Sequence, residues 1–407
     1  NFRVWAGKPV IIAFLRYVAF IFSNCMRLSV FSGVSSSAVP VPVYFSYSFT
    51  SKVPGDMVPA FFSKAMILFN CDYSEGAHAD ILRRMAETNM EQTAGYGEDP
   101  YCDQARKLIA GLCGRTDLDI HFLIGGTQTN FTVIAAALRP HQCVLCADTG
   151  HINVHESGAV EACGHKVSAI PSPDGKLTAR QIEEAWHAHW DDETREHMPQ
   201  PRMVYISQPT ELGTIYSRKE LQEISGVCRR RGLYLYMDGA RLGYGLCDED
   251  NDLDLPAIAS LCDAFYIGGT KVGALFGEAL VLRHEALKED FRYIAKQKGG
   301  RLAKGRLLGI QFLELFRDGL YFRLGAHADR LAVMLRDFCR SRGLSLPFSS
   351  GTNQQFVTMP DSVLEELGRK YGFAYLRRED KTHSTVRFCM SWATREEDVR
   401  ELMADIA

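Results

Sequence analysis

The sequence predicts an α/β fold, in which a mostly parallel seven-stranded sheet is covered by helices on both faces and is followed by a smaller α+β domain. Short apolar runs alternate with helical segments through most of the chain. Two of the helical segments begin with capping boxes, Thr178-x-x-Gln181 and Ser217-x-x-Glu220. After about residue 305 the alternation gives way to a long helical segment. Alternating strands and capped helices are typical of a parallel sheet with two covered faces.

The predicted strands of the large sheet are short apolar runs, as expected where a strand is buried on both faces. In chain order they are 121–124, 143–147, 166–170, 203–207, 233–237, 264–267 and 279–282.

The predicted helices lie between these runs, and the capping boxes mark where two of them begin. They cover 104–113, 128–138, about 154–163, 179–190 and 218–230. The last of them ends before Gly232, a residue type that commonly follows a helix C-terminus. A long helix at 307–317 then leads into the small domain, with strands near 355–359 and 385–390.

The first 65 residues do not share this patterning. Residues 10–22 form an apolar run that is too short and too interrupted for a transmembrane span, although basic residues precede it as in a signal peptide. We expect residues 1–65 to be a disordered or non-native extension, with Met66 as the natural start. The predicted domains are then a large α/β domain over 66–305 and a small α+β domain over 306–407.

Composition and charge exclude several classes of partner. Apolar residues make up 46% and charged residues 23% of the chain, which is ordinary for a soluble globular protein. A net charge of −3 gives no support to binding of nucleic acid or of a membrane surface. The 12 cysteines are scattered, which favours a reducing cytoplasm. The C-x-x-C of Cys143 and Cys146 lies in an apolar run and is interpreted as two buried thiols, so no metal is expected.

Asp238 and Lys271 each follow an apolar strand-like run. Open α/β sheets bind ligands outside the carboxyl ends of their strands, so both side chains are expected at one site. The pair suits pyridoxal phosphate, because its pyridinium nitrogen needs an anionic partner and its aldehyde forms a Schiff base with a lysine. The alternative is a buried strand end followed by an ordinary surface lysine. Arg241, just after Asp238, favours the cofactor.

Several segments, taken in order, resemble the pyridoxal-phosphate-dependent threonine aldolase and β-eliminating lyase group, which has the aspartate-aminotransferase-like fold (fold type I). The resemblance runs from about Phe69 to the end of the chain. The segments are Tyr96-Gly97-Glu98-Asp99-Pro100, Gly125-Gly126-Thr127, Asp148-Thr149-Gly150-His151, Asp238-Gly239-Ala240-Arg241 and Gly269-Thr270-Lys271. Asp-Gly-Ala-Arg is the most distinctive of them, and together they imply the fold and the cofactor.

The resemblance also implies contacts to the cofactor phosphate. Gly125, Gly126 and Thr127 resemble the family's phosphate-cradling turn, where the first amides of the next helix face an anion. Thr270 would add a hydroxyl. Lys304, in a basic stretch, is the candidate for a cationic contact, in the same subunit or across a subunit boundary. The alternatives are a plain strand–helix turn and a solvated basic helix start.

Further roles at the cofactor ring follow from the same resemblance. Asp238 would hold the pyridine nitrogen protonated, Lys271 would carry the cofactor, and His151 would stack on the ring. His151, His155 and a bound water are the candidates for the base that accepts a β-hydroxyl proton. His151 and His155 have the spacing of a zinc-binding pair, but no third ligand is evident nearby.

Three residues are candidates for contact with a substrate. Arg241 and Arg387 would bind its carboxylate, because a planar guanidinium donates two parallel hydrogen bonds to that group. The alternative for Arg387 is an ordinary arginine at a strand edge. Cys71 lies in Asn70-Cys71-Asp72, where the family has Arg-Ser-Asp, and is taken as a further substrate contact.

The resemblance implies a lyase that cleaves the Cα–Cβ bond of a β-hydroxy-α-amino acid to glycine and an aldehyde. Residues 207–211 carry no histidine, although threonine aldolases usually have one after this strand, and this departure concerns substrate handling. β-Elimination, transamination and a catalytically inactive scaffold are the alternatives; intact Asp238 and Lys271 argue against the last. Enzymes of this fold build each site at a subunit interface, so we expect a homodimer or homotetramer acting on a small amino acid.

Overall fold

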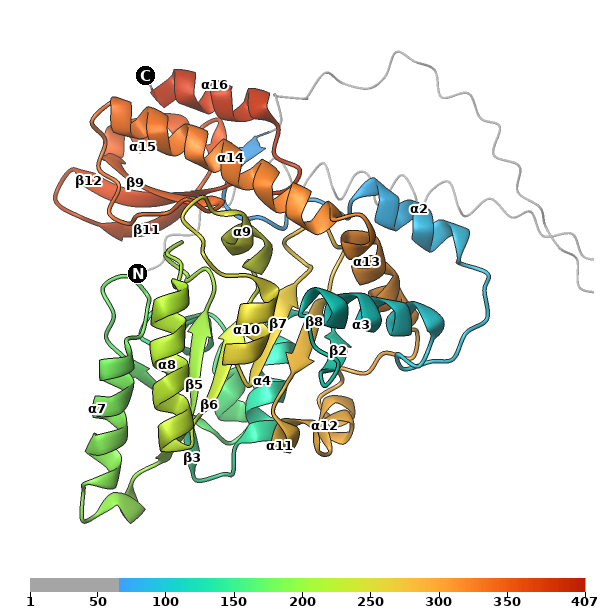
Figure 1. The fold of residues 1–407 in the computed structure, drawn as a ribbon. Helices are drawn as coiled ribbons and strands as arrows, with labels where there is room; N and C mark the ends of the chain where they lie inside the picture. The colour runs from blue at the N-terminus through green and yellow to red at the C-terminus, as the bar shows by residue number, and fades with distance from the viewer. Residues whose placement is uncertain (1–65, 407) are drawn as a thin grey trace, which may run out of the picture. The chain divides into compact units, whose positions relative to one another are not determined.

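The computed structural model describes residues 66–406, so the predicted extension over 1–65 lies outside the described residues. The large sheet has seven strands in the order β2-β8-β7-β6-β5-β3-β4 (Figure 1). Their bounds are β2 (Asp119–Leu123), β3 (Gln142–Ala147), β4 (Lys166–Ile170), β5 (Gln200–Ser207), β6 (Tyr234–Asp238), β7 (Ala264–Gly268) and β8 (Glu278–Leu282). In this sheet β8 runs antiparallel to both neighbours and the other pairings are parallel. The prediction of a mostly parallel seven-stranded sheet is therefore confirmed.

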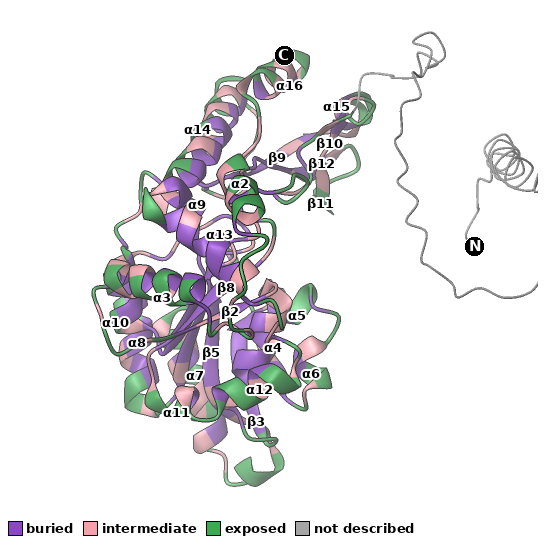
Figure 2. Ribbon diagram, turned by 90° about the vertical axis from the view of Figure 1, so that its right-hand side faces the viewer, coloured by how far each residue is buried: buried purple, intermediate pink, exposed green. Residues whose placement is uncertain are grey.

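Both faces of this sheet are buried. Side chains alternate between the two faces along each strand, so neighbouring residues belong to different apolar clusters. On β7, Phe265 and Ile267 belong to one apolar cluster, and Ala264 and Tyr266 belong to another. The first cluster includes side chains of α3 (Pro100–Leu112), α7 (Ala179–Trp190), α8 (Arg218–Arg231), α10 (Leu255–Leu261) and α13 (Arg306–Arg317). The second includes side chains of α4 (Gly126–Ala137), α6 (Ala159–Ala162), α11 (Glu285–Lys288) and α12 (Phe291–Gln297). Buried strands between helices with exposed outer surfaces are visible in Figure 2.

The predicted helix starts at 179 and 218 are confirmed, and both capping boxes are formed. The side chains of Thr178 and Ser217 each accept a hydrogen bond from the backbone three residues on, and the reciprocal side-chain bonds are present. Gly232 ends α8 with a φ of 65°, a left-handed conformation that favours glycine.

The predicted continuous helix over about 154–163 is wrong. The segment holds two short helices, α5 (His151–Val154) and α6 (Ala159–Ala162). Ser157 and Gly158 between them have φ values of 53° and 72°, which no right-handed helix contains. His151 is the first residue of α5, the first of these two helices.

The C-terminal part is built on a second, three-stranded antiparallel sheet with the order β11-β12-β9. Its strands are β9 (Gln354–Pro360), β11 (Ala374–Arg378) and β12 (His383–Cys389), and its helices are α14 (Leu320–Ser341), α15 (Asp361–Leu367) and α16 (Glu396–Ile406). The short β1 (Ile67–Leu68), which comes before the large sheet in sequence, pairs with β10 (Tyr371–Gly372). The division of the chain at residue 305 stays a prediction. Two further helices are α2 (Ala79–Glu87) and α9 (Leu242–Cys247).

Candidate active site

A cavity of about 910 Å³ lies at the carboxyl edge of the large sheet. Its walls come from the residues that end or directly follow β2, β3, β5, β6 and β7, and from the first residue of the antiparallel β8. Ala374, Tyr375 and Arg387 of the three-stranded sheet complete it. The site therefore forms where an open α/β sheet is expected to bind a ligand.

Asp238, the last residue of β6, is 4% exposed and receives four hydrogen bonds. Its Oδ1 accepts from the Tyr266 hydroxyl at 2.6 Å and from the Ala240 amide at 2.9 Å. Its Oδ2 accepts from the Tyr205 hydroxyl at 2.6 Å and from Asn130 Nδ2 at 3.0 Å. Burial alone raises the pKa of Asp238, but His151 and the two tyrosine hydroxyls outweigh it, so the pKa lies below its ordinary value. Asp238 is thus held as a carboxylate.

Lys271 follows β7 and lines the same cavity. Its removal from bulk water lowers the pKa of its amine, and the nearby positive charge of Arg241 lowers it further. The Tyr244 hydroxyl donates to the Lys271 carbonyl at 2.5 Å, which fixes the backbone. The amine is therefore poised toward its neutral, nucleophilic form.

The start of α4 forms another wall of the cavity. Gly125, Gly126 and Thr127 all line the cavity, and Gly125 is the N-cap of the helix. A Cβ atom on Gly126 would lie 3.0 Å from the Tyr266 hydroxyl, so a larger residue would crowd the donor that holds Asp238. The first amides of a helix have no intrahelical partner and favour an anion. Thr270 lines the cavity too, but its hydroxyl donates to Glu278 Oε1 at 2.8 Å.

This donor set fits pyridoxal phosphate. A buried carboxylate, a lysine of lowered pKa and a glycine-rich helix start are the three groups that its ring nitrogen, aldehyde and phosphate need. All three face one cavity, as the sequence predicts.

A polar network connects His151 to Asp238. His151 Nδ1 lies 2.8 Å from Glu156 Oε1, which also accepts from Asn130 Nδ2 at 2.7 Å. Asn130 Nδ2 donates to Asp238 as well, and its Oδ1 accepts from the Tyr236 hydroxyl at 2.8 Å. Burial lowers the pKa of His151, but the bond to Glu156 and the charge of Asp238 raise it overall.

His155 also lines the cavity, and its ring centroid lies 5.6 Å from that of His151. Burial, together with the charge of His151, lowers the pKa of His155. Among the described residues its ring packs against that of His151 at an interplanar angle of 55°.

The two predicted substrate arginines differ in their surroundings. Arg241 donates through Nε and Nη2 to the buried Asp72 carboxylate at 2.7 and 2.9 Å, so its planar fork is already occupied. Arg387 donates to Gln354 Oε1 at 3.0 Å and to the Asn70 carbonyl at 3.1 Å, while its Nε has no partner in the described chain. Both line the cavity, and Arg387 is the better placed of the two for a substrate carboxylate.

Two predicted site residues lie outside this cavity in the single chain. Lys304 is exposed in the turn before α13 and does not line the cavity of its own chain, so its contact with the phosphate stays a prediction. Cys71 contacts Ser74, with the two side-chain atoms 3.2 Å apart, and Tyr73 lines the cavity instead.

Sequence reasoning missed several site residues. Five polar residues that support or line the cavity were missed: Asp72, Asn130, Glu156, Glu211 and Glu278. Some of them lie far in sequence from the group that they contact, and the others are single polar residues beside an apolar run. The signal that could have found Glu211 is its place directly after a strand of the predicted sheet.

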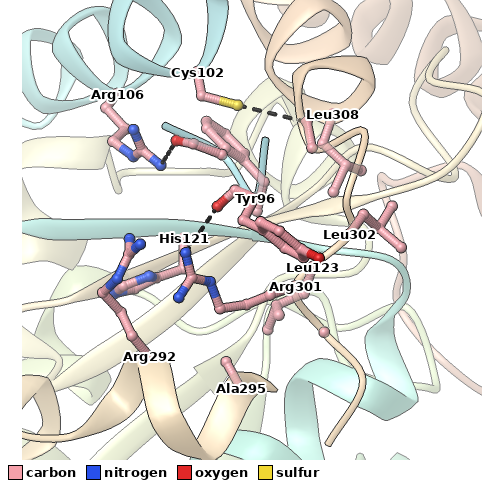
Figure 3. Close-up of a pocket in the computed structure, with 14 residues that line it drawn as sticks. Tyr96, Cys102, Arg106, His121, Leu123, Arg292, Ala295, Arg301, Leu302 and Leu308 are labelled. Carbon is pink, nitrogen blue, oxygen red and sulfur yellow. Dashed lines mark hydrogen bonds between the residues drawn. The ribbon is translucent and has the colours of Figure 1, made fainter. Parts of the chain in front are cut away.

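A second, smaller cavity of about 30 Å³ is lined by the basic side chains of Arg106, Arg292 and Arg301 (Figure 3). Arg106 donates to the carbonyls of Gly97 and Ile120, and Arg301 donates to the carbonyl of Tyr96. The volume is close to that of one water molecule. It therefore does not compete with the larger cavity as a site for substrate.

Two other kinds of feature are missing from the described part of the chain. In residues 66–406, no helix is both long enough and apolar enough to cross a membrane. The same part of the chain contains no group of three or more His, Cys, Asp or Glu residues arranged to hold a metal ion.

The chain is similar in sequence and in structure to lyases and threonine aldolases. Residues 71–362 match the family described as beta-eliminating lyase. The low specificity L-threonine aldolase of Pseudomonas sp. (strain NCIMB 10558) is 33% identical over 349 residues, which cover 83% of this chain and 96% of that protein. The structure of a threonine aldolase from Leishmania major is 44% identical, with a TM-score of 0.81 over 84% of this chain and 98% of that chain. A Thermus thermophilus aspartate aminotransferase variant, 14% identical with a TM-score of 0.62 over 84% of this chain, shares the fold.

Proposed function

The chain belongs to the beta-eliminating lyase family, and on that premise we propose that it is a pyridoxal-phosphate-dependent lyase acting on β-hydroxy-α-amino acids of the threonine or allo-threonine type. The reaction cleaves the Cα–Cβ bond and gives glycine and an aldehyde. The observation that carries this proposal is that the Asp238 carboxylate and the Lys271 amine face one cavity at the carboxyl edge of the sheet.

Different residues of the chain would bind the ring nitrogen, the aldehyde and the phosphate of the cofactor. When bound, pyridoxal phosphate supplies an electron sink for charge that develops at the substrate α-carbon. Asp238 would keep a proton on the pyridine nitrogen, because the pKa of its carboxyl is lowered. Lys271 Nζ would hold the cofactor aldehyde. The start of α4, at Gly125, Gly126 and Thr127, would bind the phosphate.

Orientation of the substrate decides which α-carbon bond breaks. We assign its carboxylate to Arg387, because this side chain lines the cavity and donates only to neutral oxygens, Gln354 Oε1 and the Asn70 carbonyl. Arg241 contributes its positive charge to the same wall while its hydrogen bonds go to Asp72. His151 lies beside the ring site, held by Glu156, as expected for a residue that packs on the cofactor face.

The assembly is proposed to be a homodimer or a homotetramer. The loop that begins at Tyr96 resembles the family's segment that reaches the neighbouring subunit's site, and Lys304 is the candidate for a phosphate contact in either subunit. Both support this proposal, because neither Tyr96 nor Lys304 lines the large cavity of its own chain. Tyr96 is 45% exposed, and its ring lies 4.3 Å from Lys296 Nζ. The described cysteines are all free thiols, which suits the proposed cytoplasmic location.

The test is to incubate the purified, cofactor-loaded protein with L-threonine, L-allo-threonine and phenylserine and to measure glycine and aldehyde. Equal amounts of the two products support the proposal. Pyruvate and ammonia from serine or cysteine, without glycine from any β-hydroxy substrate, would instead indicate β-elimination. Amino transfer to a keto acid would indicate transamination.

A further inference from the structure

Glu211 is a carboxylate that the function described so far does not use. It lies four residues after the end of β5, on the loop that crosses the carboxyl edge of the sheet. Its side chain lines the large cavity together with His151, Asp238 and Lys271. It is thus placed beside the groups that bind the reacting part of a substrate.

The two oxygens of Glu211 have different surroundings. Oε1 accepts from the His151 amide at 2.9 Å and from the Ser207 hydroxyl at 2.7 Å. Oε2 accepts no hydrogen bond from another residue in the described chain, and it is not among the buried polar atoms that lack a partner. Oε1 therefore holds the carboxylate in place, while no other residue of the described chain donates to Oε2. The carboxyl also accepts a hydrogen bond from its own backbone amide.

Three buried carboxylates around the cavity lack this arrangement. Asp238 uses both oxygens in four hydrogen bonds. Glu278 accepts from the Thr270 hydroxyl on one oxygen and from the Gly269 amide on the other. Glu156 holds Asn130 and His151 with Oε1, and its Oε2 is buried away from the cavity space. Of these four, Glu211 is the carboxylate that lines the cavity with an oxygen to which no other residue of the described chain donates.

We propose that Glu211 is the catalytic base that accepts the β-hydroxyl proton during Cα–Cβ cleavage, an assignment that rests on the proposed function. The O–H bond breaks and the proton goes to Glu211 Oε2. The oxygen electron pair forms the carbonyl of the aldehyde as the Cα–Cβ bond breaks. The electron pair of that bond passes to the α-carbon, which takes up one proton when glycine forms, and Glu211 releases its proton to water.

The electrostatic setting supports this role. Burial raises the pKa of Glu211, and the negative charge of Asp238 raises it further. A carboxylate with a raised pKa is a stronger base than an ordinary one, and general bases work best with a pKa near the operating pH. The titratable groups that face it are Cys146 on β3, His151 on α5, Tyr205 on β5, Tyr216 before α8 and Asp238 on β6.

The first test is Glu211→Gln in the cofactor-loaded protein. Glutamine keeps the volume and an acceptor oxygen for the His151 amide and the Ser207 hydroxyl, but it does not take up a proton. Loss of a positioned general base should lower kcat for cleavage of L-threonine or L-allo-threonine by about 100-fold or more. Exchange of a glycine α-proton in heavy water should stay within a few-fold, because that reaction has no β-hydroxyl. Glu223→Gln, the same change at an exposed position on α8, serves as the matched control and should change neither rate.

A second test does not depend on activity. The His151 amide donates to Glu211 Oε1, so its NMR resonance reports the protonation of Glu211. In cofactor-free protein labelled with ¹⁵N-histidine, this resonance should titrate with a midpoint above that of an ordinary glutamate. Glu211→Gln should remove that titration step, and Glu223→Gln should leave it. Cleavage should fall as the pH is lowered, because the base acts only when it is deprotonated.

The outcomes separate this assignment from the proposed function. A kcat for cleavage in Glu211→Gln within ten-fold of the wild-type value overturns the role of Glu211. An equal loss of cleavage and of α-proton exchange overturns it too. Loss of cleavage in His155→Ala but not in Glu211→Gln assigns the proton to His155 instead. Wild-type protein that exchanges the glycine α-proton but cleaves no β-hydroxy amino acid overturns the proposed function, and the role of Glu211 falls with it.

Discussion

Asp72 and Arg241, which are 169 residues apart in sequence, meet in a bidentate ion pair of 2.7 and 2.9 Å at the wall of the cavity. Asp72 is fully buried and also accepts from Asn353 Nδ2 at 2.9 Å. The Arg241 guanidinium beside Asp72 offsets the effect of burial and lowers the pKa of that carboxyl to about 2. The pair thus joins the segment before α2, the segment before α9 and the segment before β9.

Asp72→Ala should destabilise the protein by about 3–5 kcal/mol, because it leaves a buried guanidinium without its partner. The double variant Asp72→Ala/Arg241→Met removes both charges and should recover a large part of that loss. Denaturant unfolding of the cofactor-free proteins measures the difference. A double variant that is no more stable than Asp72→Ala would show that the lost pairing is not the cause.

Glu278→Gln should stabilise the cofactor-free protein, and more so as the pH rises. Burial raises the pKa of Glu278 from the ordinary 4.5 to about 8. Between these values the folded protein holds a proton that the unfolded chain has lost, so wild-type stability falls as the pH increases through this range. The gain from the substitution should therefore grow from about pH 4.5 to pH 8 and level off above it. Unfolding measured at several pH values checks this, and a gain that does not change with pH would contradict it.

Lys271→Ala should abolish covalent attachment of the cofactor. Borohydride reduction of the wild-type protein should fix pyridoxal phosphate on the peptide that contains Lys271, because this amine faces the cavity with a lowered pKa. Peptide mapping by mass spectrometry locates the adduct. An adduct on another lysine of the wild-type protein would refute the assignment.

Arg387→Ala should raise KM for the amino-acid substrate by about 10- to 100-fold, since it removes a charged hydrogen-bond donor from the carboxylate. Cofactor affinity should change little. Arg378→Ala, an exposed arginine on the neighbouring β11, is the matched control. Steady-state kinetics and cofactor titration separate the two effects, and an unchanged KM would leave Arg241 as the carboxylate ligand.

Sedimentation of the purified protein should show a dimer or a tetramer of the 45.6 kDa chain. The reason is that the Tyr96 loop and Lys304 lie outside the cavity of their own chain. A fully active monomer at the concentrations used for assay would contradict this prediction. If the oligomer dissociates on dilution, activity should fall with it.

The fold was predictable because a strand that is buried on both faces of a sheet is apolar along its whole length, and this pattern is visible in the sequence. The strand 264–267, for example, is apolar throughout and is wholly buried in β7. The split between α5 and α6 was not predictable, because it depends on a left-handed φ at Ser157, a conformation that serine seldom adopts.

The candidate site was predictable where a residue directly follows a strand. Asp238, Lys271 and His151 each end or follow one, and all three line the cavity. Asn130 was missed because its contact with Asp238 spans 108 residues, and no periodicity records such a pairing. The engagement of Arg241 by Asp72 was missed for the same reason, since residue type alone does not tell which partner a guanidinium binds.

The position of Asn130 has a consequence for how the site responds to pH. Its amide nitrogen donates one hydrogen bond to Asp238 and one to Glu156, so it orients the carboxylates of both. An amide does not give up either hydrogen near neutral pH, and no proton travels through it from one carboxylate to the other. His151 and Asp238 therefore affect each other's pKa through their charges, without passing a proton through Asn130. Because the positive charge of His151 helps to lower the pKa of Asp238, loss of that charge as the pH rises removes one of the effects that keep the Asp238 carboxylate ionised.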